Sequence, residues 1–281
     1  MKKVTILFII ISLFSISSGQ SQELVTEKQK HTEDSQATSK DVILLDSLVK
    51  VIKTPALHSN LFPALSTFYK GDGDCRIIEN DLISIIESGP TDDFAVTNLA
   101  ISCLKKIKSE KATPILYEKM MHLLSNPDHE LFKKEIKFFS DGDGYLPKSI
   151  GEYYISEYQG GLAGIGGDGV RKLVLPMLES DNELIKYKGA MILGSMGDVV
   201  AVPILCEKLG KSKEPNTRLG LVLTLGKLGD QRAVPFLIKA LKDKYNGWSD
   251  DYPVRRAAYL SLLKMGVNVV QQNENTYKVL K

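Results

Sequence analysis

The sequence predicts an all-α protein, an α-solenoid in which helical hairpins stack one after another. The first observation behind this prediction is an internal repeat. Residues 193–209, LGSMGDVVAVPILCEKL, recur at 225–241 as LGKLGDQRAVPFLIKAL, a spacing of 32 residues. Nine of the 17 paired positions are identical, where ordinary composition gives about one by chance. The second observation is that apolar residues recur at helical spacing, while strand-like alternation is almost absent.

Each copy of the repeat is predicted to be a helical hairpin. An amphipathic helix is expected over 182–196, and Gly197-Asp198 ends it, because glycine readily takes the left-handed conformation that terminates helices. A second helix begins near Val199 and carries Pro203 in its first turn, where the missing N–H costs little. The next unit repeats each step, with helix 219–228, the turn Gly229-Asp230, and helix 233–241 with Pro235.

A third copy, VRRAAYLSLLKMGVN at 254–268, follows at an offset of 37 rather than 32 residues. In this register a basic residue stands at the same point of each first helix: Lys186, Arg218 and Arg255. Four residues earlier in each copy stands an acceptor suited to a helix start: Asn182, Glu214 and Asp251. Two interpretations stay open: these rows link adjacent units, or they are solvated surface charges. The same alignment predicts that three leucines occupy equivalent buried positions: Leu193, Leu225 and Leu262.

An older and more divergent copy covers residues 91–124. It aligns Ala112-Thr113-Pro114 with 201–203, but the Gly-Asp turn is lost. A single hairpin cannot bury both of its apolar faces, whereas stacked copies bury a continuous core. We therefore expect the solenoid to extend from residue 41 to residue 281. Further helices are predicted around 60–69, 79–88, 92–108, 112–125, 127–139, 147–158 and 169–180.

The repeat pattern is an acidic or capping residue, a basic residue four positions later, LGxLGD, and then AVPxLxxAL. It resembles the short HEAT-like repeats of the phycobilisome bilin lyase family. The resemblance covers 181–243 well, 248–268 moderately and 91–125 faintly. It implies a right-handed stack of helical hairpins that holds other proteins, and it transfers no catalytic residue. Deoxyhypusine hydroxylase has similar repeats and holds iron with several His-Glu pairs, but this chain has one such pair, His129-Glu130. We therefore expect no enzyme, no catalytic residue, no metal site and no cofactor.

The N-terminus reads as an export signal. Two lysines precede an apolar run over 4–16, and the small residues Ser17 and Gly19 suit a cleavage site, so residues 1–19 are predicted to be a signal peptide. The alternative is an uncleaved anchor, but the run is shorter than the roughly 20 residues that a spanning helix needs. Residues 20–40 are polar and aperiodic, which predicts a disordered tether. The mature protein is expected to be periplasmic or secreted, without stable membrane insertion.

Charge and cysteine content narrow the classes of partner. With 36 basic and 34 acidic residues the net charge is +2, which disfavours nucleic acid because such partners need an excess of clustered basic residues. Cys75, Cys103 and Cys206 are too few for a disulfide framework. Buried free thiols and one disulfide with a free thiol both remain open.

Short motifs that resemble ligand loops have simpler explanations. GIGGDG at 164–169 lacks the strand that precedes a dinucleotide loop, so we expect a loop before a helix over 169–180. GDGD at 71–74 and DGDG at 141–144 look like fragments of a calcium loop, but with Asp141 and Asp143 as its third and fifth positions the first and twelfth would be Phe139 and Ile150, which cannot bind a cation, so we expect helix-ending turns.

Two irregular segments are the predicted binding surface. Residues 140–168 interrupt the repeats and are rich in tyrosine, and the spacer 244–253 holds the single tryptophan. Insertions in solenoids often lie on the binding face, and aromatic residues often anchor interfaces. Four residues are therefore predicted to bind a partner: Tyr145, Tyr154, Tyr158 and Trp248. At least partial exposure of Tyr154, Tyr158 and Trp248 is expected, and the alternative is that these rings pack against neighbouring helices.

The favoured function is an exported, non-enzymatic scaffold that binds a protein or peptide on one face of the stack. The alternative is an exported enzyme or small-ligand carrier whose pocket lies under the 140–168 segment. These hypotheses rest on the repeat architecture and on the lack of a catalytic constellation in the sequence.

Overall fold

The computed structural model describes residues 61–70, 74–88, 94–135, 149–247, 252–273 and 275–280. The chain divides into two units, 1–42 and 43–281, and all described residues belong to the second. Tyr145 and Trp248 therefore lie outside the described residues, as do the predicted signal peptide, tether and acceptor Asp251.

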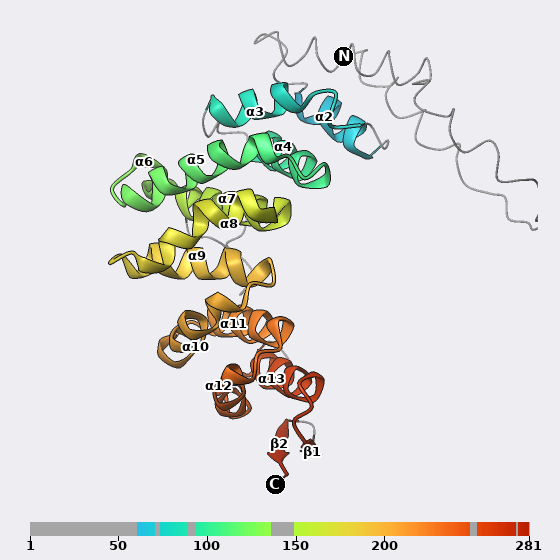
Figure 1. Cartoon of the computed structure of the whole chain (residues 1–281), viewed down its shortest axis with the longest axis vertical. Coiled ribbons are helices and arrows are strands. Elements are labelled where there is room, and N and C mark those ends of the chain that lie inside the picture. Colours follow the sequence, from blue (N-terminus) through green and yellow to red (C-terminus); the bar gives the residue numbers. More distant parts are fainter. Residues whose placement is uncertain are drawn as a thin grey trace, which may run out of the picture. The chain divides into compact units, whose positions relative to one another are not determined.

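The second unit is a stack of α-helices in chain order, which confirms the predicted α-solenoid (Figure 1). The α-helices are α2 (Leu61–Lys70), α3 (Glu79–Glu87), α4 (Phe94–Lys106), α5 (Thr113–Ser125), α6 (Glu130–Lys133), α7 (Ile150–Ile165), α8 (Gly167–Val174), α9 (Glu183–Ser195), α10 (Val202–Lys211), α11 (Pro215–Leu228), α12 (Val234–Ala240) and α13 (Pro253–Lys264). Helices that are close in the chain pack together, as α11 does with α9, α10 and α13. One continuous apolar core runs through the stack.

Helix packing explains the first half of the repeated motif, the Leu-Gly pair. Leu193, Leu225 and Leu262 are all 0% exposed, so the predicted register is confirmed. The glycine that follows each of the first two leucines lies where helices approach closely. A Cβ atom on Gly194 would lie 2.9 Å from Leu205 and Thr224, and one on Gly226 would lie 2.0 Å from the Ser261 hydroxyl. Any larger side chain would push the units apart.

The second half of the pattern makes the turn between the two helices. Gly197 and Gly229 adopt left-handed φ values of +92° and +68°, which cost least for glycine. The next residue, Asp198 or Asp230, accepts a hydrogen bond from the backbone N–H two positions on, at 3.1 and 2.9 Å. A short 3-10 turn follows, Val199–Ala201 in one unit and Gln231–Ala233 in the next, and leads into the second helix.

The divergent copy at 91–124 keeps this turn with different residues. Lys108 takes the left-handed conformation with φ +55° at the position equivalent to Gly197. Ser109 replaces the aspartate, and its hydroxyl accepts a hydrogen bond from the N–H of Ala112 at 3.2 Å. The geometry of the repeat therefore extends to α4 and α5, although the Gly-Asp residues of the turn do not recur there.

Two arginines of the predicted basic row reach the loop that ends the preceding unit, Arg218 at the Lys213 carbonyl and Arg255 at the Asp243 carbonyl, which supports the first of the two interpretations for them. Arg218 also forms an ion pair within its own unit. Arg218 donates to both carboxylate oxygens of Asp243, at 2.6 and 2.9 Å, with side-chain exposures of only 17% and 8%. It also donates to the carbonyl of Lys213, in the loop that ends the preceding unit. Arg255 donates to the carbonyl of Asp243 and, at 3.0 Å, to that of Asn275. We call the Arg218–Asp243 pair the clasp.

The carboxylate in the clasp was not among the predicted acceptors. Asn182 does cap its helix by accepting hydrogen bonds from Leu184 and Ile185, whereas Glu214 makes no side-chain cap. Burial would raise the pKa of Asp243, but the hydrogen bonds from Arg218 and from the Tyr245 amide hold it below its ordinary value.

The unit of α9 and α10 has no equivalent clasp in the described residues. The positions equivalent to Arg218 and Asp243 are Lys186 and Lys211, which are both cations. Lys186 instead pairs with Glu183 at 3.3 Å, and Lys211 pairs with Glu207 at 2.5 Å. Because like charges cannot close on each other, this end of the unit stays open.

The structure differs from the sequence prediction at three places. From Ser149 onward the segment predicted to be an irregular insertion is regular, because α7 is a 16-residue helix packed on α4 and α5. The predicted helix 169–180 begins earlier, at Gly167, directly after a sharp break at Gly166.

After α13 two strands, β1 (Val269–Asn273) and β2 (Thr276–Val279), form an antiparallel hairpin that an all-α prediction does not contain. Tyr277 of the hairpin stacks on Tyr259 of α13.

Candidate functional site

The two predicted binding tyrosines that the structure describes are buried. Tyr154 and Tyr158 are 0% and 1% exposed, so the predicted exposure of these rings is wrong. The reason is that α7 is continuous, and residues four apart on a helix share a face. Their rings stack at 5.8 Å between centroids on the face of α7 that packs into the core. Burial also raises the pKa of Tyr158. Neither ring can contact a partner in this arrangement.

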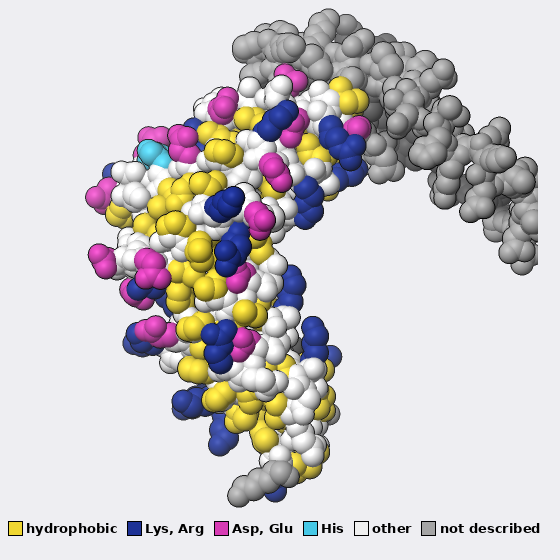
Figure 2. Space-filling view, viewed as in Figure 1, with side chains coloured by type: hydrophobic (Ala, Val, Ile, Leu, Met, Phe, Trp, Pro, Cys, Tyr) yellow, Lys and Arg dark blue, Asp and Glu magenta, His cyan; other side chains and the backbone are white. Residues whose placement is uncertain are grey.

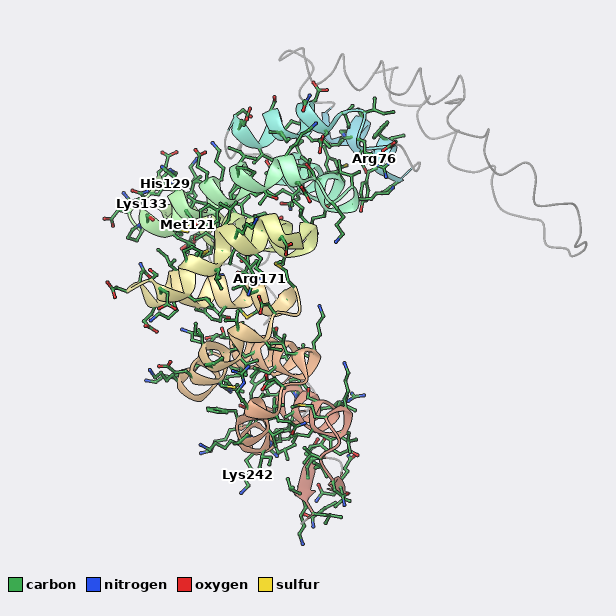
Figure 3. The ribbon with its side chains drawn as sticks, viewed as in Figure 1. Arg76, Met121, His129, Lys133, Arg171 and Lys242 are labelled. Carbon is green, nitrogen blue, oxygen red and sulfur yellow. The ribbon has the colours of Figure 1, made fainter. Side chains whose placement is uncertain are left out.

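A small polar cavity of about 340 Å³ lies beside Tyr158. The buried Tyr158 hydroxyl has no hydrogen-bond partner in the described part of the chain. His122 and His129 also line this cavity, with their rings edge to face at 5.4 Å. His129 caps α6 by accepting from the N–H of Leu131 and lies close to Lys133 (Figure 3). Among the described residues no group of three or more His, Cys, Asp or Glu side chains could hold a metal ion.

A larger cavity of about 780 Å³ lies beside α7. The apolar wall comes from α5, α6 and the turn between them, with Leu123, Leu124, Pro127 and Phe132, and α7 adds Ile155 together with Ser156 and Glu152. A second wall comes from α9, α10 and the loop before α11, and it carries four lysines: Lys188, Lys208, Lys211 and Lys213. Figure 2 shows hydrophobic side chains gathered over α5, α7 and α9, with Lys and Arg side chains among them. The cavity thus has an apolar side and a cationic side.

Lys188 on α9 is the distinctive cation of this cavity. It is half-buried, and the described residues offer its ammonium no hydrogen bond and no ion pair. Burial lowers the pKa of Lys188, and the nearby Glu152 carboxylate offsets this only in part. The equivalent positions of the next two units hold Gly220 and Ala257. The lysine is therefore not a requirement of the repeat.

The other lysines of the wall are held in different ways. Lys211 pairs with Glu207, and this hydrogen bond raises the pKa of Lys211 and lowers that of Glu207. The ammonium of Lys208 lies 5.0 Å from the centre of the Tyr187 ring, within the range of a cation–π contact. Lys213 is exposed in the loop. With Glu152 and Glu214 on the same lining, four cations face two anions.

A separate surface feature is a row of exposed apolar side chains, which we call the apolar row. Leu223 on α11 and Leu260 on α13 stand at equivalent positions of successive units and are 55% and 54% exposed. Leu263, on the same helix as Leu260, is 42% exposed. Met191 on α9 holds the equivalent position of the preceding unit and is half-buried. Exposed apolar side chains that align across units mark interaction surfaces more often than isolated ones do.

Comparison with known proteins bears directly on the repeat. Residues 217–243, which contain most of α11, all of α12 and both members of the clasp, match the family model described as PBS lyase HEAT-like repeat. The chain carries a HEAT-like repeat. The predicted resemblance is confirmed. No match was found among curated proteins.

Two solved structures are similar to this HEAT-like repeat protein. One is the complex of CpcE and CpcF of phycocyanin lyase from Nostoc sp. PCC7120, with 16% identity over 93% of this chain and 95% of that chain, at a TM-score of 0.39. The other is human deoxyhypusine hydroxylase in complex with glycerol, with 14% identity over 81% of this chain and 98% of that chain, at a TM-score of 0.31. Likenesses this distant concern the fold and carry no substrate or partner to this chain.

These comparisons correct one prediction. From the repeat class we expected that the chain is not an enzyme. Both similar structures are named as enzymes, a lyase and a hydroxylase, and the matching repeat model is itself named for a lyase. The expectation is wrong, because the possession of HEAT-like repeats does not separate scaffolds from enzymes.

Sequence reasoning passed over the residues that line the larger cavity. The sequence predicted aromatic binding residues in the segment 140–168. The residues of this segment that line the cavity are instead Glu152, Ile155 and Ser156. A usable signal was present in the alignment of the units, because Lys188 stands where the next two units have Gly220 and Ala257 and the divergent copy has the uncharged Leu99. Among the described helices none is long and apolar enough to cross a membrane.

Proposed function

We propose that this HEAT-like repeat protein is exported and binds a partner protein or peptide on its apolar row. The observation that carries the proposal is the exposure of Leu223 and Leu260, 55% and 54%, at equivalent positions of adjacent units. Solenoids recognise partners by presenting equivalent positions of successive units on one extended surface. A leucine in water gains about 1.5–3 kcal/mol when a partner buries it fully.

The flanking residues indicate the chemistry of the partner. One turn after each leucine of the row stands an exposed lysine, Lys227 after Leu223 and Lys264 after Leu260, and Arg256 lies one turn before Leu260. Lys227 also donates to the carbonyl of Ser195, at 2.8 Å, across the unit boundary. A partner that places apolar side chains on the row and carboxylates beside them would match this surface.

The proposal can be tested by site-specific photo-crosslinking. A photoreactive phenylalanine analogue at position 223 is expected to capture a protein partner in the exported fraction. The matched control is position 199, because Val199 is 46% exposed but lies in the turn between α9 and α10, away from the row. With the analogue moved to position 263, where Leu263 is also exposed, the double variant Leu223→Asp, Leu260→Asp is expected to abolish capture without loss of helical circular dichroism. Equal capture from positions 223 and 199, or unchanged capture from position 263 in the double variant, would refute the row as the binding surface.

Export is the second part of the proposal, and it is supported by the signal-like residues 1–19. Two buried thiols provide an internal reporter of the compartment. A hydrogen bond joins the thiols of Cys75 and Cys103, which lowers the pKa of Cys75 and raises that of Cys103, and neither cysteine forms a disulfide in the structure. Thiols this close can form a disulfide in an oxidising compartment.

We expect protein recovered from its native compartment to show a Cys75–Cys103 crosslink in non-reducing peptide mass spectrometry. A version lacking residues 1–19, kept in a reducing cytosol, is expected to stay reduced and gain the crosslink only on treatment with oxidised glutathione. Cys206 has no neighbouring thiol among the described residues and serves as the unpaired control. Recovery of the full-length, uncleaved chain in the reducing compartment would overturn export.

A further inference from the structure

We propose that the larger cavity binds a small amphiphilic carboxylate, with the Lys188 ammonium binding the carboxylate and the apolar wall covering the rest of the ligand. This ligand site is separate from the apolar row and extends the function beyond partner binding. It also identifies a ligand class for the alternative of a carrier with a pocket beside the 140–168 segment.

The size of the cavity fits a small molecule. Ligand pockets commonly have volumes of about 300–1,000 Å³, and this one measures about 780 Å³. It is bounded by side chains from α5, α6, α7, α9, α10 and the start of α11, so it is a feature of the stack and not of one loop. A ligand there would contact several units at once.

The distribution of polarity favours a ligand with an apolar body and one anionic end. Leu123, Leu124 and Phe132, from α5 and α6, form a part of the lining that carries no charge. Lys188 lines the same cavity and has no hydrogen-bond or ion-pair partner among the described residues. A half-buried ammonium without such a partner is unfavourable, because the nearby Glu152 carboxylate offsets the loss of water only in part. A carboxylate placed beside it would supply the missing charge-assisted hydrogen bond.

The surrounding charges favour an anion over a cation. The charged groups that line the cavity with Lys188 are Glu152 on α7, Lys208 and Lys211 on α10, and Lys213 and Glu214 in the following loop. Four positive charges against two negative ones give a net attraction for anions. Lys211 and Lys208 are already engaged by Glu207 and by the Tyr187 ring, which leaves Lys188 as the best-placed cation for the ligand.

Comparison of the units supports a ligand role for Lys188 over a structural one. Gly220 and Ala257 at the equivalent positions show that the helix needs no long side chain there. Around Gly220 no atom would lie within 4 Å of an added Cβ. Lysine at 188 therefore adds a charge that the fold does not use.

The test is isothermal titration calorimetry of the full chain with dodecanoate below its micelle concentration. We expect one saturable site per chain. Methyl dodecanoate and dodecyltrimethylammonium, which keep the apolar tail but lack the anion, are expected to bind at least tenfold more weakly. Acetate, which lacks the tail, is expected to show no binding. Equal affinity for dodecanoate and its methyl ester would overturn the proposal, and so would the absence of saturable binding by dodecanoate.

Variants separate Lys188 from the general charge of the protein. Lys188→Met is expected to weaken dodecanoate binding at least tenfold, while Lys188→Arg retains most of it. Lys172→Met on α8, outside the lining of the cavity, is the matched control and should bind as the unmodified protein does. Melting curves confirm that each variant is folded before titration. Unchanged affinity in Lys188→Met would refute the assignment, as would an equal loss in Lys172→Met. The double variant Leu223→Asp, Leu260→Asp should still bind dodecanoate, which distinguishes failure of this site from failure of the apolar row.

Discussion

The unit formed by α9 and α10 and the unit formed by α11 and α12 share a turn, a cap and a buried leucine, but they are held together differently. In the second unit the clasp joins Arg218 of the first helix to Asp243 after the second helix. In the first unit the equivalent residues are Lys186 and Lys211, and each pairs with a glutamate of its own helix. The larger cavity lies at this unclasped end.

The difference shows how a repeat array acquires a site without a change of fold. The apolar and turn positions are kept because stacking depends on them, whereas the charged positions at the ends of helices can vary. Replacement of one carboxylate by a lysine removes the clasp and adds a cation to the space that it would have closed. The same unit also carries Lys188 where the others have Gly220 and Ala257. Lysines at positions 188 and 211, in place of the glycine and aspartate of the neighbouring unit, therefore replace the clasp with cations that line the cavity.

The largest expected effects test what the two units share. Leu193→Ala and Leu225→Ala each remove a side chain that is 0% exposed, and each is expected to cost about 2–5 kcal/mol, as large-to-small changes in a packed core do. Denaturation by urea, followed by far-ultraviolet circular dichroism, measures both losses. Leu223→Ala, on the exposed face of α11, is the control and should change stability little. A near-neutral Leu225→Ala would mean that the units are not packed in this register.

The next effect tests the clasp. Asp243→Ala leaves Arg218 largely buried without its carboxylate and is expected to cost about 2 kcal/mol, less than for a fully enclosed pair because the clasp is close to solvent. Lys211→Ala at the equivalent position removes only an exposed ion pair and should leave the denaturation midpoint unchanged. If both variants lose the same stability, the contrast between the units is not electrostatic.

A smaller effect, of opposite sign, is expected at Lys188. Lys188→Met keeps most of the side-chain volume and removes a half-buried charge, so it is expected to stabilise the fold by about 1 kcal/mol at neutral pH. Because burial lowers the pKa of Lys188 in the folded protein below its unfolded value, the unmodified protein gains stability as pH rises between the two values. The advantage of Lys188→Met should therefore be full at neutral pH and vanish as pH rises past the unfolded pKa. An advantage that does not depend on pH would contradict a charge effect.

The smallest effect comes from rebuilding the clasp in the first unit. The double variant Lys186→Arg, Lys211→Asp gives this unit the residues of its neighbour and is expected to raise the denaturation midpoint slightly. It should also weaken dodecanoate binding, because it removes a cation from the cavity and closes its open end. Lys186→Arg alone keeps two cations at these positions and should show no gain, and Lys211→Asp alone should gain less than the double variant, because the ammonium of Lys186 lacks the two-pronged geometry of a guanidinium. A double variant no more stable than its singles would show that the backbone, and not the side chains, keeps this end open.

Much of the fold can be predicted from the sequence, because equivalent residues have the same structural role in successive units. The leucine, the close-packing glycine and the left-handed glycine each have one structural task, and all three recur 32 residues later in the next unit. The divergent copy was harder to recognise, because Lys108 and Ser109 perform the tasks of glycine and aspartate with other chemistry. In that copy the Gly-Asp sequence is lost, but the turn keeps the same backbone geometry.

The candidate site was less predictable, because it depends on which face of a helix is covered. The tyrosines of α7 have the composition of an interface, but Tyr154 and Tyr158 share the face that packs into the core. The hairpin after α13 was also missed, although VVQQNENTYKV carries a turn-forming Asn-rich centre between two β-prone runs. The cavity itself joins residues about 90 positions apart, from Leu123 to Thr217, and no local pattern records such a distance.

The packing of each helix on its near neighbours in the chain has a consequence for how the molecule opens. Contacts of this kind are local in sequence, which favours rapid folding that can begin at any well-packed unit and spread outward. The same property allows single units to unfold while the rest of the stack persists. A partner on the apolar row would touch α9, α11 and α13 together, and so would couple openings that are otherwise independent. Hydrogen exchange should then slow in all three helices at once, including amides that the partner never touches.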